Sequence, residues 1–204
     1  MMIYKIQKNK AFTLVELMVA TTLFTVIMLM GVGSLVVSSN SAKASQKLRI
    51  AVDNVNFAME SMTRELRMGT YYQCETISVN LSDTSAYKDC PLGVSYGYII
   101  AFNPQQIIGI PTPTRVSYQL VDRTDGSNTK SLQRCEKGVT PCPEIVSGDV
   151  NITELKFYVK GSDPADKIQP RVEILIKGEV NIKNKNMTKS FTLQTMTSQR
   201  SAEK

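Results

Sequence analysis

The chain has 204 residues, enough for one sizeable domain and one additional element. With 42% hydrophobic and 21% charged residues it is not disordered throughout, and its lack of histidine removes the commonest catalytic base and metal ligand. Half of the net charge of +6 lies on Lys5, Lys8 and Lys10, whereas residues 69–204 carry 16 basic and 14 acidic residues. This distribution argues against nucleic acid as a partner.

A basic segment, residues 1–11, precedes a long apolar segment. Residues 17–37 carry no charge, and this length is close to the roughly 20 helical residues that cross a bilayer. Because positively charged flanks stay in the cytoplasm, we expect one membrane-spanning helix with a cytoplasmic N-terminus and the rest of the chain outside. A secretory signal would end in a small-residue cleavage site, but the loose candidate at residues 36–42 lies inside a continuing helical pattern.

Glu16 is the unusual residue of this region, since it lies at the edge of the apolar segment. A carboxylate within the bilayer costs about 2.5–3.5 kcal/mol on insertion scales, so such a residue is usually functional and has a partner. The alternative is that Glu16 lies at the membrane interface, where the cost is small.

Residues 10–17, KAFTLVEL, resemble the cleavage and methylation motif of type IV prepilins and type II secretion pseudopilins, with Ala11 where glycine is usual. The resemblance implies that a prepilin peptidase cuts between Ala11 and Phe12 on the cytoplasmic side, and that the new amine of Phe12 is methylated. It also implies that Glu16 pairs with the terminal amine of a neighbouring pilin or pseudopilin. The implied filament grows from an assembly platform in the inner membrane. Such a pair of buried charges favours specificity of register more than stability.

The helix is expected to continue beyond the apolar segment, because no proline occurs before Cys90. Apolar residues recur there at intervals of three and four, as on a helix with one buried face: Leu48, Val52, Val55, Met59, Met62 and Leu66. Glu60 and Arg64 form an i, i+4 pair in the favourable order, and Gly69 is a candidate C-terminal cap. A coiled coil fits the same spacing, but the stripe lasts only about three heptads.

The predicted helix covers residues 12–68, roughly 85 Å at 1.5 Å per residue. The chain then divides into four segments: a cleaved leader (1–11), a membrane or filament-core helix (12–37), its amphipathic continuation (38–69) and a β-rich head (70–204). Gly31 and Gly33 interrupt the strong helix formers. They fit a bend, a segment that unwinds on assembly, or close helix packing, and the sequence leaves these alternatives open.

The head is predicted to contain strands rich in β-branched and aromatic residues, at 94–102, 115–121, 152–159, 171–180 and 187–196. Turn signals separate them, at 103–104, 111–113, 125–126, 161–164 and 184–186. Strands without intervening helices favour an antiparallel sheet. A long helix on such a sheet is the α+β, pilin-like fold that the family resemblance implies.

The C-terminal half of the head adds a second resemblance, to minor pilins and J-type pseudopilins. Four segments carry it: residues 152–157, 169–174, 191–195 and 198–200. The same segments also fit ordinary β-hairpins.

The chain has four cysteines, and none of them forms the C-x-x-C spacing of zinc or thioredoxin-like sites. An even count after an export signal indicates disulfides, and short loops favour Cys74–Cys90 and Cys135–Cys142. Four free thiols are the alternative.

No cofactor or metal site is expected. Asp122, Asp125 and Asn128 offer oxygen ligands of the kind that Ca²⁺ takes, but their spacing does not match an EF-hand, and a hairpin turn at Asp125-Gly126 explains the segment.

The chain is therefore predicted to be a structural subunit of a type IV pilus or type II secretion pseudopilus. We expect it in the inner membrane and then in a filament outside the cytoplasm, where its large head suits a minor subunit. The second hypothesis is a minor pilin whose head binds DNA or a surface. An anchored enzyme is disfavoured, because the sequence has no nucleophile motif and no phosphate-binding glycine loop.

Overall fold

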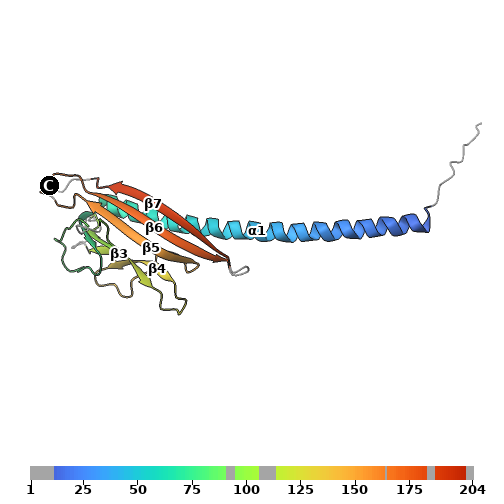
Figure 1. Cartoon of the computed structure of the whole chain (residues 1–204). Helices are drawn as coiled ribbons and strands as arrows, with labels where there is room; N and C mark the ends of the chain where they lie inside the picture. The colour runs from blue at the N-terminus through green and yellow to red at the C-terminus, as the bar shows by residue number, and fades with distance from the viewer. Residues whose placement is uncertain (1–11, 91–94, 106–113, 164, 183–186, 201–204) are drawn as a thin grey trace, which may run out of the picture. The chain divides into compact units, whose positions relative to one another are not determined.

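The computed structural model describes residues 12–90, 95–105, 114–163, 165–182 and 187–200. The chain divides into two compact units, residues 1–46 and 47–204. Helix α1 (Leu14–Met68) contributes to both, and all of the strands belong to the second unit (Figure 1). A long N-terminal helix followed by antiparallel sheets confirms the α+β, pilin-like fold expected from the sequence.

The strands form two antiparallel sheets rather than the single sheet that was predicted. The first has the order β1-β2-β3-β4: Thr70–Glu75, Ile99–Asn103, Val116–Asp122 and Lys130–Glu136. The second has the order β5-β6-β7: Val150–Lys160, Arg171–Ile182 and Met187–Ser198. Each pair of sequence neighbours within a sheet is an antiparallel ladder.

Strands β2, β3, β5, β6 and β7 correspond to the five predicted strands, with shifted ends. Residues 96–98 of the predicted 94–102 strand make only an isolated bridge at Gly97, and residue 94 lies outside the described part of the chain. Strands β1 and β4 were not predicted. Both contain several polar residues and no apolar run, and pairing with β2 and β3 places them in the sheet. Two predicted turns, at 111–113 and 184–186, lie outside the described residues.

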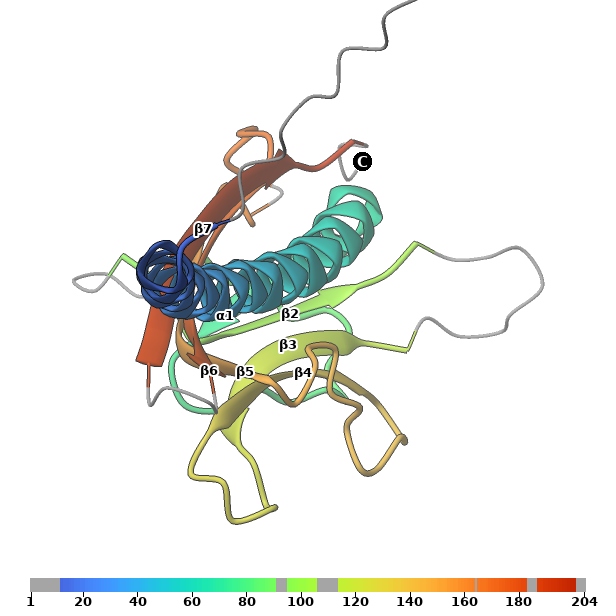
Figure 2. The same ribbon diagram turned by 90° about the vertical axis from the view of Figure 1, so that its right-hand side faces the viewer.

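The core of the second unit lies between residues 47–68 of α1 and the two sheets (Figure 2). Of the predicted stripe, Val55, Met59, Met62 and Leu66 are buried, and Leu48 and Val52 are partly buried. Ala51 and Ala58 are also buried, so the buried face is wider than the predicted stripe. Their small side chains let the helix approach the sheets closely. The predicted pair of Glu60 and Arg64 is formed at 3.0 Å on the exposed face.

Groups from the head satisfy the last carbonyls of α1. The Tyr72 hydroxyl donates to the Leu66 carbonyl, the Arg200 amide to the Arg67 carbonyl at 2.8 Å, and the Gln199 side chain to the Gly69 carbonyl at 3.1 Å. Gly69 follows the helix as predicted, but its backbone does not take the left-handed conformation of a capping glycine. It is needed instead for close packing, since a Cβ there would lie 2.5 Å from the Phe102 ring.

Candidate functional site

The motif region forms the start of helix α1. Thr13 is the N-cap residue, because its Oγ1 accepts a hydrogen bond from the Glu16 amide at 3.3 Å and its carbonyl accepts one from the Leu17 amide at 3.2 Å. Phe12 directly precedes the cap, and 78% of it is exposed. Ala11, the other residue of the predicted cleavage site, lies outside the described residues.

Glu16 occupies the third position of the helix and completes the spacing of a capping box, in which the acidic side chain bonds back to the N-cap amide. Only half of the box is formed. Among the interactions of the described residues, the Glu16 carboxylate has no hydrogen bond and no ion pair. The positive end of the helix dipole stabilises a carboxylate at this position, and both of its oxygens are available to a cation.

The apolar segment that follows is exposed along its length. The described helix contains an 18-residue window of mean hydropathy 2.1, none of it buried, so α1 is long and apolar enough to cross a membrane. Its hydroxyl groups bond within the helix. Thr21 donates to the Met18 carbonyl at 3.0 Å, Thr22 to the Val19 carbonyl at 2.9 Å, and Thr25 to the Thr22 carbonyl at 2.8 Å. Hydroxyls satisfied in this way can face lipid at low cost.

Gly31 and Gly33 are helical, so α1 is not unwound in this structure. A Cβ at either residue would meet no atom within 4 Å among the described residues. Close helix packing through these glycines therefore needs a second chain.

The head contains two disulfides, which are the pairs that short loops favour. Cys74–Cys90 has an S–S distance of 2.08 Å and Cys135–Cys142 one of 2.05 Å. The second of these closes a short loop, because Cys135 lies in β4 and Cys142 is seven residues further along the chain.

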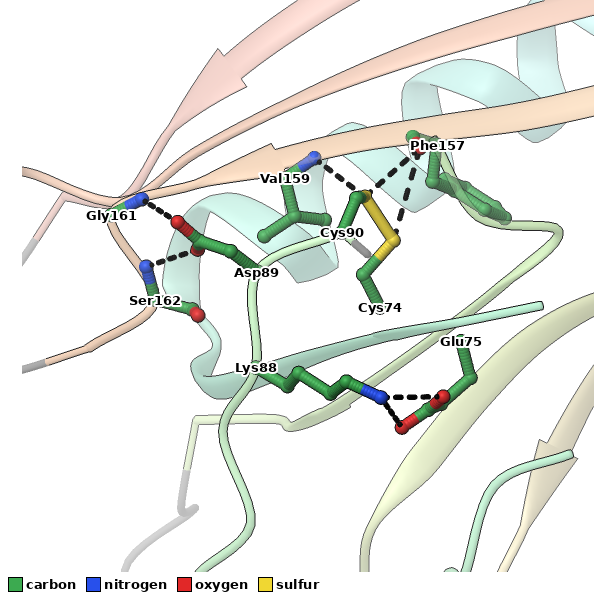
Figure 3. The surroundings of a disulfide bond; sticks show 9 residues. All are labelled: Cys74, Glu75, Lys88, Asp89, Cys90, Phe157, Val159, Gly161 and Ser162. Atoms are coloured by element: carbon green, nitrogen blue, oxygen red, sulfur yellow. Dashed lines mark hydrogen bonds and ion pairs between the residues drawn. A yellow bond between two sulfur atoms is a disulfide. The ribbon is translucent and has the colours of Figure 1, made fainter. Parts of the chain in front are cut away.

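Cys74–Cys90 lies where the two sheets meet (Figure 3). Cys74 belongs to β1, while the Cys90 Sγ accepts a hydrogen bond from the Val159 amide of β5 at 3.1 Å. The neighbouring Asp89 carboxylate accepts bonds from the amides of Gly161 and Ser162 at 3.2 and 2.8 Å. The disulfide thus ties β1 to residues 89 and 90, which hydrogen-bond to the end of β5 and the residues that follow it.

A buried arginine, which the sequence did not single out, organises the same region. Arg115 is fully buried and donates to the Ala86 carbonyl at 2.8 Å and the Gln73 side chain at 3.0 Å. It also donates to the Tyr71 carbonyl at 3.2 Å and the Asn103 side chain at 3.3 Å. Burial lowers its pKa. In the sequence it is one arginine at the start of a strand, so only its neighbours in space reveal its importance.

The acidic segment after β3 is a turn. The Asp125 carboxylate accepts a hydrogen bond from the Ser127 amide at 2.9 Å, and Gly126 and Asn128 have φ angles of 75° and 57°. No group of three or more acidic or cysteine ligands that could hold a metal occurs among the described residues.

Comparison with known protein families matches residues 6–32 to the family described as the prokaryotic N-terminal methylation motif. The matched segment includes Phe12, Thr13, Glu16 and most of the apolar residues 17–37. Comparison with curated proteins and with solved structures finds no match. The match is consistent with the type IV pilin and pseudopilin family and points to a structural subunit rather than an enzyme.

Proposed function

We propose that this chain, which carries the prepilin-type methylation motif, is a minor subunit of a type IV pilus or type II secretion pseudopilus. A prepilin peptidase cuts it between Ala11 and Phe12, and the new amine of Phe12 is methylated. The mature chain then joins other pilins or pseudopilins in a filament that grows from an inner-membrane platform.

The observation that carries this proposal is the free Glu16 carboxylate in the first turn of an exposed apolar helix. The structure leaves this carboxylate without a partner among the described residues, in a segment where an unpaired charge costs about 2.5–3.5 kcal/mol in lipid. The cut before Phe12 creates a positive amine on every subunit. Pairing of that amine with Glu16 of a neighbour neutralises both charges in one axial register.

The proposed location follows from the charges that flank the apolar helix. The three lysines of the leader keep the N-terminus in the cytoplasm, so the helix crosses the membrane once and the head lies outside. Disulfides form on that side, which agrees with the two in the head.

The head fits a minor subunit better than the major subunit that repeats along a filament. The head has two sheets and long connections, among them residues 76–98 between β1 and β2. Among the described residues of the head, the pairing of five basic side chains with acids does not favour DNA capture. Lys88, Arg123 and Arg134 each pair with an acid, and Lys156 and Lys177 share Glu154.

The test is removal of the Glu16 charge with its size retained. We expect Glu16→Gln to be inserted and cut like the wild-type chain but to be absent from sheared filaments or from cross-linked pseudopilus complexes. Asp53→Asn removes another exposed helical carboxylate and should be incorporated normally. Normal incorporation of Glu16→Gln would contradict the pairing, and an uncut wild-type chain would contradict the proposal as a whole.

A further inference from the structure

Three sheet edges in the described part of the chain are covered over part of their length by straps, which are short segments of the chain that hydrogen-bond to the edge strand. Residue 88 lies along β1, where the Cys74 amide donates to the Lys88 carbonyl at 2.9 Å. Residues 143–145 cover β4, where the Arg134 amide donates to the Pro143 carbonyl at 3.1 Å. Gly97 covers β5 and exchanges two 2.8 Å bonds with Phe157. Covering of this kind protects unpaired backbone groups from other chains.

The outer edge of β7 has no such strap among the described residues. The Gln199 amide donates to the Pro170 carbonyl at 2.9 Å, and the β6–β7 register continues without a shift for twelve residues. Hydrogen-bonded pairs alternate in an antiparallel ladder, so odd-numbered residues of β7 bond to β6. The even-numbered residues therefore direct their amides and carbonyls away from the sheet: Thr188, Ser190, Thr192, Gln194, Met196 and Ser198.

This edge lacks the devices that block strand addition. Strand β7 contains no proline and a single charged residue, Lys189. Thr188, Ser190, Thr192 and Gln194 are exposed. Next to the edge, a groove of about 390 Å³ opens between α1 and β7. Asn56, Glu60 and Thr63 line it from the helix, and Leu193 lines it from the strand.

We propose that the edge of β7 receives an extended segment of a different subunit, which adds a fourth strand to the sheet. The guest strand would place side chains over the hydroxyls of Thr188, Ser190 and Thr192 on one face and into the groove on the other. Uncharged, β-branched or hydroxyl residues fit the first face, and polar residues fit the helix wall of the groove. Main-chain hydrogen bonds supply the affinity, as in other strand-addition complexes.

A second copy joined through antiparallel pairing of the two β7 edges is the wrong occupant. Antiparallel pairing of β7 with β7 of a copy needs a two-fold axis perpendicular to the strands. That axis reverses residues 47–68 of α1, which lie along the sheet (Figures 1 and 2). When two copies are anchored in one membrane, their helices enter the heads from the same side. A two-fold axis that reverses the helix therefore cannot relate them. This choice of partner rests on the proposed function.

The test is photo-crosslinking of the full-length protein in the cells that naturally produce it. A photo-reactive phenylalanine analogue replaces Ser190 at the edge, or the exposed Lys137 as a control. We expect the analogue at position 190, and not at 137, to form an adduct with another chain that carries its own N-terminal methylation motif, identified by mass spectrometry.

A second substitution tests whether that adduct depends on strand pairing. Thr192→Pro removes an outward amide but no bond to β6, so the sheet should persist while the adduct falls at least about tenfold. Thr192→Val keeps the amide and should leave the yield unchanged. Thr192→Lys, which alters no backbone group, should also lower it.

Several outcomes would overturn the proposal. They are no adduct at position 190, equal adducts at 190 and 137, an adduct only with a second copy, or a yield that neither Thr192→Pro nor Thr192→Lys lowers. Cutting before Phe12 and filament incorporation are measured on the same samples. A chain that is cut and incorporated without an adduct contradicts strand addition alone. A chain that is neither cut nor incorporated contradicts the proposed function and the choice of partner with it.

Discussion

The Tyr118 hydroxyl on β3 donates to the Glu65 carboxylate on α1 over 2.9 Å, and this bond ties the helix to the first sheet. Arg134 on β4 approaches the same carboxylate at 3.2 Å and also contacts Glu136 at 3.0 Å. Tyr118 is buried, so its hydroxyl needs this acceptor. The contact adds a directional hydrogen bond to the apolar packing between the helix and the first sheet.

Tyr118→Phe tests that contact through the pH dependence of stability. Burial raises the pKa of Tyr118, and the Glu65 carboxylate raises it further. Below pH of about 10, tyrosine is protonated in both the folded and the unfolded chain. Above it the unfolded tyrosine loses its proton while Tyr118 keeps it, so the free energy of unfolding falls as pH rises.

We therefore expect the wild-type chain in detergent to lose stability above pH of about 10 more steeply than Tyr118→Phe does. At neutral pH the variant should be less stable by about 1 kcal/mol. Tyr87→Phe, at a partly exposed tyrosine, is the control and should follow the wild-type curve. Urea unfolding followed by circular dichroism measures each value. Equal slopes for wild type and Tyr118→Phe would contradict the assignment.

Gly97→Ala should lower the stability of the head, because Gly97 lies where the two sheets meet, beside Cys74 and Phe157. A Cβ at Gly97 would lie 2.5 Å from the Cys74 Sγ and 2.7 Å from the Glu75 carbonyl oxygen, and neither atom can move without shifting the disulfide or β1. We expect a loss of about 1–3 kcal/mol in the free energy of unfolding. At Gly148 a Cβ meets no described atom within 4 Å, so Gly148→Ala should be neutral or stabilising by up to about 1 kcal/mol. Equal changes in the free energy of unfolding for the two substitutions would show that close packing at Gly97 does not determine the effect.

Loss of the two disulfides should have unequal effects. In the chain-entropy view, a loop of 16 residues contributes about 3 kcal/mol and one of 7 residues about 2 kcal/mol. Cys74–Cys90 also links β1 of the first sheet to a residue that hydrogen-bonds to β5 of the second, so its double serine variant should lose more stability than the Cys135 and Cys142 variant. Alkylation under non-reducing conditions should label no thiol in the wild-type protein. Four labelled thiols would contradict both pairings.

Ala11 decides the rate of processing under the proposed function. Glycine is usual at this position in the family that the motif resembles, so Ala11→Gly should be cut at least as fast as the wild-type chain. Ala11→Glu should stay uncut, with a mass about 11 residues too high, because a large charged side chain replaces a small one. Intact-mass measurement of membrane fractions distinguishes the two. Normal cutting of Ala11→Glu would show that the cleavage site does not lie between Ala11 and Phe12.

Patterns of neighbouring residues determined the first third of this chain, up to the end of the long helix. The uncharged run of residues 17–37, the Thr13–Glu16 spacing and the stripe through Leu66 need only local geometry to be read, because a helix bonds each residue to one four positions away. The five predicted strands were recognisable in the same way, from β-branched and aromatic residues. The pairing of the cysteines followed from short loops.

The tertiary structure alone decided the division of the head into two sheets, the strands β1 and β4, and the burial of Arg115. These features depend on contacts between distant segments, such as Gly97 with Phe157. Polar strands like β4 show no apolar run, and their backbone groups are satisfied only when a partner strand lies beside them. The open edge of β7 belongs here too, because only the strand order shows that no described segment pairs with its outer side.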